Sequence, residues 1–296
     1  MNNIEIFNDT QNHIRNNEHL WALTQHATHN TRVIGESFIS GNCPDFDKMH
    51  VSFEENLTLI PAIRLTDEGK KTAILNFANP VEPGGGVLRG ANAQEEYLCR
   101  ASNLYNCLIS DQAKSFYQYH RNRIGQNTSV YLGSDIIVYS PGITVIREDR
   151  GYFPDMECYP KQEYTDTWRT VDVITCAAPF FSRSDYLLGG EELYQLFCRR
   201  IKNIFETAIE NRVQALILGA FGCGAFHNPP VVVAKAFSDV LMEKRYSNAF
   251  SNVVFAVRRS GSFCENIEAF DIAFREFPPS GQYVFSTETN KRRFFE

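Results

Sequence analysis

The sequence predicts an α/β fold in which helices cover a mostly parallel β-sheet, with a helical extension at the N-terminal end. Three observations favour this class. Apolar runs typical of buried strands alternate with amphipathic helices through the second half of the chain. Two strands lead directly into glycine-rich loops. The 296 residues are 43% hydrophobic and 13% aromatic, which indicates a large folded core. We therefore expect an extension over residues 1–65, packed on a core domain over residues 66–296.

The first part of the chain contains one clear helix and one clear strand. Residues 12–29 form a polar-rich helical pattern, and the short apolar runs that follow are separated by loops. Residues 72–78, TAILNFA, form a continuous apolar run, which suits a strand buried on both faces. Residues 94–109 then predict a helix, and its first turn carries acidic side chains, which suit the helix dipole.

The second half of the chain repeats strand and helix. Strands are predicted over residues 135–140, 171–178, 214–220 and 252–257. Helices are predicted over residues 191–212, 229–244 and 264–274. The first strand is expected to end at Pro141-Gly142, because proline cannot donate a hydrogen bond to a neighbouring strand. Residues 147–166 are polar and rich in turn-forming residues, so we expect a long excursion there.

Charge and cysteine spacing exclude several classes of function. The chain has 29 Lys+Arg against 35 Asp+Glu, a net charge of −6, which argues against sequence-specific or general nucleic-acid binding. No apolar run reaches the ~18–20 residues that a bilayer span needs, so no membrane association is expected. The eight cysteines show no C-x-x-C and no zinc-like spacing. We expect reduced thiols in a cytoplasmic protein, and no metal site.

Two glycine-rich segments are the most informative motifs. Residues 83–96 read PGGGVLRGANAQEE, and residues 219–230 read GAFGCGAFHNPP. Glycines between a strand and a helix let backbone N–H groups approach an anion closely. Because ligands of open α/β sheets bind beyond the carboxyl ends of strands, two such loops side by side would bracket a diphosphate. Neither segment has the sequence of a P-loop or of a dinucleotide-binding G-x-G-x-x-G motif.

The first of these segments carries a family resemblance. Three glycines at 84–86, then seven residues, then Gln-Glu-Glu at 94–96, resemble the signature of poly(ADP-ribose) glycohydrolases. Over roughly residues 15–275 the chain most closely resembles the short, bacterial-type members of that family, which are built on a macrodomain core. The segment NFAN at 76–79, the second glycine loop and the strand at 252–257 are also similar. The resemblance therefore implies a macrodomain-like core, with neither a cofactor nor a metal.

The resemblance also implies a reaction and its catalytic residues. The family cleaves the ribose–ribose O-glycosidic bond of poly(ADP-ribose) and releases ADP-ribose. Such cleavage passes through an oxocarbenium-like transition state, and the leaving oxygen needs a proton. By resemblance, Glu96 is the acid that supplies it and then activates the incoming water, and Glu95 holds ribose hydroxyls. Adjacent residues on a helix differ by about 100° in direction, so the two carboxylates cannot point at one atom.

The same resemblance assigns the residues that bind the substrate. Asn79 would contact the ribose at the scissile end, the first glycine loop would wrap the phosphates, the second would donate N–H groups from the other side, and Phe226 would pack on the terminal ribose. The full set is Asn79, Gly84, Gly85, Gly86, Val87, Gln94, Gly222, Cys223, Gly224, Ala225, Phe226 and Asn228. On the side expected to hold the adenine, Phe180 and the pair Arg258-Arg259 depart from the family pattern.

Other functions stay open on the sequence alone. The protein could hydrolyse mono-ADP-ribose linkages, or it could be a macrodomain that binds ADP-ribose without cutting it. A macrodomain that only binds ADP-ribose has no need of an intact Gln-Glu-Glu. Catalysis by Cys223 with His227 is disfavoured, because the loop offers no third group to orient the pair. The expected partner is poly(ADP-ribose), or ADP-ribose on modified proteins, bound by a monomer, and the resemblance to the bacterial group implies cleavage from the chain end.

Overall fold

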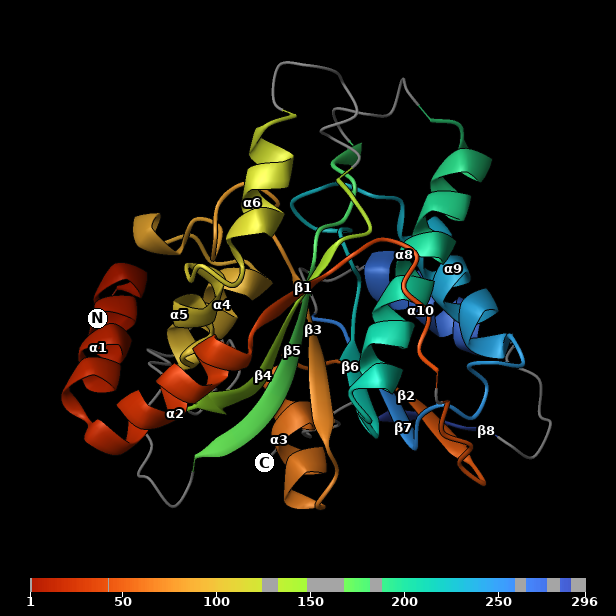
Figure 1. Ribbon diagram of the computed structural model, residues 1–296. Helices are drawn as coiled ribbons and strands as arrows, with labels where there is room; N and C mark the ends of the chain where they lie inside the picture. The colour runs from red at the N-terminus through yellow and green to blue at the C-terminus, as the bar shows by residue number, and fades with distance from the viewer. Residues whose placement is uncertain are drawn as a thin grey trace, which may run out of the picture.

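The described residues of this computed structural model form one eight-stranded sheet covered by helices on both faces (Figure 1). The structure describes residues 2–41, 43–123, 133–147, 168–181, 188–258, 265–275 and 283–288. The strands are β1 (Arg32–Ile34), β2 (Met49–Glu54), β3 (Thr72–Phe77), β4 (Ile137–Val145), β5 (Arg169–Cys176), β6 (Ala215–Leu218), β7 (Asn252–Ala256) and β8 (Tyr283–Glu288). The helices are α1 (Asn3–Asn16), α2 (Glu18–Asn30), α3 (Leu59–Asp67), the 3₁₀ turn η1 (Val87–Arg89), α4 (Gln94–Ala101), α5 (Leu104–Leu108), α6 (Lys114–Arg121), α8 (Gly190–Glu210), α9 (Pro230–Met242) and α10 (Glu265–Arg275).

The sheet is mostly parallel, as the sequence predicted. Its strand order is β1-β4-β5-β3-β6-β7-β2-β8. Strand β4 pairs antiparallel with both β1 and β5, and every other pairing is parallel. The carboxyl ends of β2, β3, β5, β6 and β7 therefore lie along the same edge, and the loops that follow these strands can meet there.

Burial on both faces explains why the central strands are continuously apolar. Leu75 of β3 belongs to the cluster formed with α8 and α9, whereas its neighbour Ile74 belongs to the cluster formed with α3, α4 and α5. Successive residues of a strand point to opposite faces, so a strand covered on both sides needs apolar residues at every position. Figure 1 shows α8, α9 and α10 on one side of the sheet and α1, α2, α4 and α5 on the other.

Most of the predicted elements are confirmed, and three boundaries were wrong. The helix predicted over 12–29 is two helices, because Asn17 ends α1 and its side chain accepts a hydrogen bond from the N–H of Leu20 in α2. The helix predicted over 94–109 breaks after Ala101, where Asn103 pairs with the backbone of Thr144. Strand β4 continues past Pro141-Gly142 to Val145, because the pairing with β5 shifts register at that point.

The N-terminal region also contributes to the sheet. Within residues 1–65, β1 adds an edge strand beside β4, and β2 lies between β7 and β8. Helix α1 packs on α4, and the Thr10 hydroxyl donates a 2.6 Å hydrogen bond to the Arg100 carbonyl. The division of the chain at residue 65 stays a prediction. Of the excursion expected over 147–166, only Arg147 lies within the described residues.

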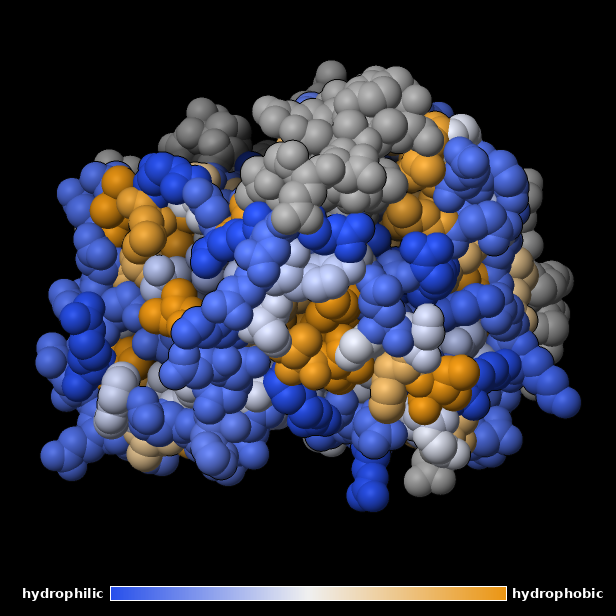
Figure 2. All heavy atoms as spheres, turned by 45° about the horizontal axis from the view of Figure 1, so that its top comes forward, coloured by the Kyte–Doolittle hydropathy of each residue, from blue (hydrophilic) through white to orange (hydrophobic). Residues whose placement is uncertain are grey.

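Among the described residues, few large apolar side chains are exposed. Ile39 and Val231 are the most exposed of them, at 73% and 68%. The face in Figure 2 is largely hydrophilic, with apolar side chains gathered in separate patches. Among the described residues, no helix combines the length and the apolar character needed to cross a bilayer.

Candidate active site

A cavity of about 410 Å³ opens at the carboxyl edge of the sheet. Segments after five parallel strands line it. The lining residues are Asn56 to Thr58 after β2, Ala93 and Gln94 in the segment after β3, Ala178 after β5, Ala220, Gly222 and Gly224 to Phe226 after β6, and Val257 with Arg258 after β7. Helix α1 closes part of the wall with Asn3 and Ile6. The sequence predicted a ligand site at this edge, and both glycine-rich segments contribute to the lining. The first contributes Asn92 to Gln94, whereas Gly84 to Val87 do not line the cavity.

The first glycine loop holds two buried carboxylates at the start of α4. Glu95 and Glu96 are only 3% and 7% exposed. The backbone N–H of Asn79 donates a 2.8 Å hydrogen bond to Oε2 of Glu95. Glu96 accepts 2.7 Å and 3.0 Å hydrogen bonds from the N–H groups of Gly86 and Ala93. Since Ala93 lines the cavity, the Glu96 carboxylate lies one hydrogen bond behind the cavity wall.

Gly85 is required where the loop passes the carboxylates. Its φ of 59° is in the left-handed region that favours glycine. A Cβ atom at this position would lie 2.4 Å from Oε1 of Glu96 and 3.1 Å from Oε2 of Glu95. Both carboxylates therefore pack directly over Gly85. The neighbouring Gly84, with a φ of 70°, would place a Cβ 2.8 Å from the Tyr105 ring.

Burial sets the protonation of Glu95. Burial, with a smaller contribution from the charge of Glu96, raises the pKa of Glu95 to about 8, against the hydrogen bonds from the Asn79 N–H and the Asn76 amide. Glu95 therefore retains its proton near neutral pH. Asn76 lies fully buried in β3, with its amide nitrogen 3.4 Å from Oε1 of Glu95 and 3.2 Å from the Thr175 hydroxyl. Asn76 was part of the NFAN resemblance but was given no role from the sequence, although a polar residue inside a buried apolar strand was a visible signal.

Three other predicted residues of this segment have structural contacts. Gln94 ties α4 to β3, because its Oε1 accepts from the Phe77 N–H and its Nε2 donates to the Leu75 carbonyl, at 2.9 Å and 2.8 Å. Oδ1 of Asn79 accepts from two backbone N–H groups of the following turn. The Val87 side chain is fully buried in the core. Contact of these residues with a substrate stays a prediction.

The second glycine loop is fastened to the segment after β5. Asn228 donates from its amide to the carbonyls of Pro179 and Gly222, at 2.8 Å and 2.9 Å. A Cβ atom on Gly222, whose φ is 75°, would lie 2.4 Å from that of Ala178. The Phe226 ring packs against Phe180, with ring centroids 5.1 Å apart. Asn228 thus clamps the two segments together, while Gly222, Gly224, Ala225 and Phe226 line the cavity.

Cys223 is placed differently from the residues around it. Its side chain packs against the apolar core cluster and is absent from the cavity lining. Burial raises the pKa of its thiol well above the ordinary value, so the thiol stays protonated near neutral pH. This agrees with the preference against cysteine catalysis.

The cavity also contains residues that sequence reasoning did not identify. Asn3 and Ile6 come from α1, Asn56 follows β2, and Tyr97 and Arg100 come from α4. Asn3, Ile6 and Asn56 are distant in sequence from the glycine loops, and only the fold brings them to the cavity. Tyr97 and Arg100 follow Glu96 on the same helix, so their place after the Gln-Glu-Glu motif was a signal that could have found them.

Comparisons with known proteins agree with this arrangement. Residues 2–148 match the family described as microbial-type PARG, catalytic domain. The structure is similar to poly(ADP-ribose) glycohydrolase from Thermomonospora curvata, with 29% identity over 92% of this chain and 99% of that chain, and a TM-score of 0.79. It is also similar to the same enzyme bound to the inhibitor ADP-HPD, with 28% identity over 92% and 99% of the two chains and a TM-score of 0.76.

A second bacterial enzyme gives the same result. The poly(ADP-ribose) glycohydrolase from Deinococcus radiodurans in complex with ADP-ribose matches at 28% identity over 85% of this chain and 97% of that chain, with a TM-score of 0.68. No curated protein matches the sequence. The fold and the paired carboxylates define a glycosidase with an α/β core. Within that class, the chain belongs to the microbial-type poly(ADP-ribose) glycohydrolases.

Proposed function

We propose that this protein hydrolyses the ribose–ribose O-glycosidic bonds of poly(ADP-ribose) and releases ADP-ribose. The observation that carries this proposal is the buried pair Glu95 and Glu96, held by the first glycine loop beside a cavity at the carboxyl edge of the sheet. Glycoside cleavage requires a carboxyl group that can donate a proton to the leaving oxygen, and this pair supplies two buried carboxyl groups.

Glu96 is the general acid and base of this reaction. Its carboxyl group donates a proton to the leaving ribose oxygen as the C–O bond breaks and an oxocarbenium-like centre develops. The resulting carboxylate then accepts a proton from the attacking water, whose oxygen bonds to the anomeric carbon. Glu95 binds ribose hydroxyls and fixes the sugar relative to Glu96. The pKa of Glu95, raised to about 8, leaves this carboxyl group protonated near neutral pH, which suits a side chain that hydrogen-bonds ribose hydroxyls.

The second glycine loop binds the diphosphate and the terminal ribose. Its backbone N–H groups at Gly222, Gly224 and Ala225 are the proposed donors, and Phe226 packs on the ribose, while the Cys223 N–H donates to the Ala220 carbonyl. In the first loop the N–H groups of Gly85, Gly86 and Val87 already donate to the Glu82 carbonyl, the Glu96 carboxylate and the Gly84 carbonyl, so they hold the loop and the carboxylate in place. The exposure of Gly224 and Ala225 supports this role, because their N–H groups lie on a loop that lines the cavity. The domain is accordingly macrodomain-like, and the protein acts as a monomer on chain ends. The six described cysteines are all free thiols, which supports a cytoplasmic location.

The test is to incubate the purified protein separately with poly(ADP-ribose) and with mono-ADP-ribosylated protein, and to quantify free ADP-ribose. We expect rapid release from the polymer and little from the mono-modified protein. Release from the mono-modified protein alone would make the protein a mono-ADP-ribosyl hydrolase. Tight ADP-ribose binding in calorimetry, without release of ADP-ribose from either substrate, would make it a binding protein without hydrolase activity.

A further inference from the structure

We propose that Arg200, which lies outside the cavity, is a positioning residue. It fixes the position of the second glycine loop at the carboxyl edge of the sheet and thereby sets the affinity for ADP-ribose. This inference rests on the proposed function and adds a residue to it. Arg200 belongs to the long helix α8, and its side chain is 1% exposed. A guanidinium group that is buried so completely needs several partners, so its contacts show what it holds in place.

Arg200 connects two points at the carboxyl edge of the sheet. Its Nε donates a 3.0 Å hydrogen bond to Oδ1 of Asp135, and its Nη1 donates a 2.7 Å hydrogen bond to the carbonyl of Ala177. Ala177 is the first residue after β5. One rigid, planar group therefore joins the segment before β4 to the segment after β5.

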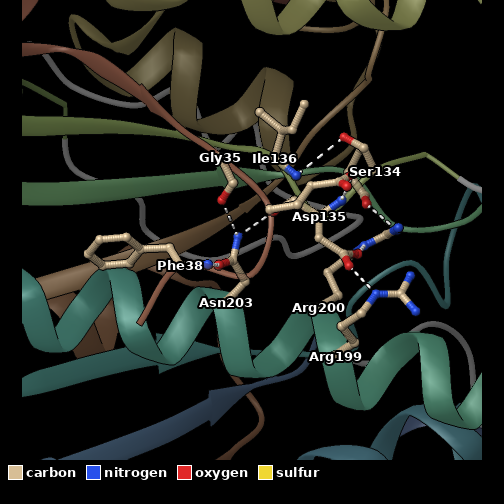
Figure 3. Close-up of polar contacts among 10 residues, drawn as sticks. Gly35, Phe38, Ser134, Asp135, Ile136, Arg199, Arg200 and Asn203 are labelled. Carbon is tan, nitrogen blue, oxygen red and sulfur yellow. Dashed lines mark hydrogen bonds and ion pairs between the residues drawn. The ribbon is translucent and has the colours of Figure 1, made fainter. Parts of the chain in front are cut away.

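The Asp135 end of this link is firmly fixed. Arg199 donates from Nε to the other carboxylate oxygen, and Asn203 donates to the backbone carbonyl of Asp135 (Figure 3). The same Asn203 side chain binds the carbonyl of Gly35 and the N–H of Phe38. Figure 3 shows Arg199, Arg200 and Asn203 extending from α8 toward this point. Asp135 is thus a stationary anchor, and the Ala177 carbonyl is the end that Arg200 holds against it.

The Ala177 end leads directly to the second glycine loop. Ala178 packs so closely on Gly222 that a Cβ at Gly222 would lie 2.4 Å from it. The Pro179 carbonyl accepts from Asn228, and the N–H of Phe181 donates a 2.9 Å hydrogen bond to the Phe226 carbonyl. The loop of the proposed phosphate donors therefore rests on the segment after β5, whose first carbonyl is bound by Arg200.

The carboxylates are held by a different set of contacts. Glu95 and Glu96 bind the N–H groups of Asn79, Gly86 and Ala93, all in the segment between β3 and α4. Loss of the Arg200 link would shift the binding loop without moving these carboxylates. Binding lost equally from the ground state and the transition state raises KM and leaves kcat unchanged.

The test compares Arg200→Lys with the wild-type protein in two measurements: the Kd for ADP-ribose by calorimetry, and KM and kcat on poly(ADP-ribose). A lysine keeps one positive charge beside Asp135 but cannot span both acceptors. We expect Kd and KM to rise about tenfold, with kcat within about threefold of wild type. Asp135→Asn, which weakens the anchor, is the second variant. It should shift the same constants in the same direction, and it decides the question if Arg200→Lys does not fold.

Arg245→Lys is the matched control. Arg245 also joins a buried carboxylate, that of Glu206, to a backbone carbonyl, that of Ser40, but these residues lie near the amino end of β6. This variant should lose stability and keep the Kd and KM of wild type.

The proposal is overturned if Arg200→Lys and Asp135→Asn lower only the melting temperature, or if Arg245→Lys raises Kd as much as Arg200→Lys does. A wild-type protein that binds ADP-ribose without cutting the polymer would refute the proposed function, and the calorimetric comparison would still test Arg200. A wild-type protein that neither binds nor cuts would overturn both.

Discussion

The backbone N–H of Gly86 donates a 2.7 Å hydrogen bond to the carboxylate of Glu96, ten residues further along the chain. The triple glycine and the Gln-Glu-Glu segment are therefore in direct contact with each other. The sequence suggested that the glycines are there to wrap a diphosphate. The structure adds a second reason for them, since the same loop fixes the orientation of the two carboxylates.

Gly85→Ala should damage catalysis more than folding. The new methyl group would lie 2.4 Å from Oε1 of Glu96, and the φ of 59° is unfavourable for alanine. A displaced carboxylate no longer meets the leaving oxygen, so we expect kcat/KM on poly(ADP-ribose) to fall by about 100-fold. Gly35→Ala is the control, because no atom lies within 4 Å of the Cβ added there. Equal activity of the two variants would show that the loop does not orient the carboxylates.

Glu95 should make the free energy of unfolding fall as the pH rises. Its pKa is raised from 4.5 to about 8 in the folded state, so the folded protein keeps a proton that the unfolded chain has already lost. The protonated group stabilises the fold fully below pH ~4.5, and that contribution is lost progressively as the pH rises to ~8. Glu95→Gln, which cannot ionise, should be more stable than wild type at pH 9 by roughly 2–4 kcal/mol and within about 1 kcal/mol of it at pH 5.

Urea unfolding of both proteins at the two pH values measures this difference. Glu191→Gln, which changes an exposed carboxylate on α8, should show no such pH-dependent gain. If Glu95→Gln gained no more stability at pH 9 than at pH 5, Glu95 would not be the group that holds the proton.

Asn228→Ala should loosen the second glycine loop and the segment after β5 at once. The substitution removes the amide that donates to the Pro179 and Gly222 carbonyls, so the buried Pro179 carbonyl loses this donor, while the Gly222 carbonyl keeps the backbone N–H of residue 228. We expect a loss of about 1–3 kcal/mol in the free energy of unfolding and a several-fold rise in KM. Denaturant titration and steady-state kinetics measure the two effects. Asn122→Ala, at an exposed position after α6, is the control, and unchanged KM in Asn228→Ala would argue against the clamp.

The sequence predicted the strands best where both faces of the strand are buried. Strands β3 and β6 were predictable, because both faces of each are covered and the apolar run is unbroken. Strand β2 was not: its sequence MHVSFE mixes polar and apolar residues, and its place is set by pairing with β7 and β8. The continuation of β4 past Pro141 was also invisible, since only the register shift against β5 accommodates the proline.

The two glycine loops of the site were predictable from the sequence, but several other residues that line the cavity were not. Each glycine loop follows a buried strand within a few residues, so local patterning was enough to place both. Asn3, Asn56 and Arg258 reach the cavity from segments that are distant in sequence, and their meeting depends on the order of strands in the sheet. The raised pKa of Glu95 likewise depends on burial, which the sequence does not state for a charged residue in the first turn of a helix.

The most direct test of the central claim is kcat of Glu96→Gln on purified poly(ADP-ribose), measured beside the Kd of the same variant for ADP-ribose. Glutamine keeps the shape of the side chain and cannot donate or accept the catalytic proton. We predict that kcat falls by about 10³-fold or more while the Kd stays within about threefold of wild type. A variant that still cuts the polymer at near the wild-type rate would contradict the assignment of Glu96 as the acid.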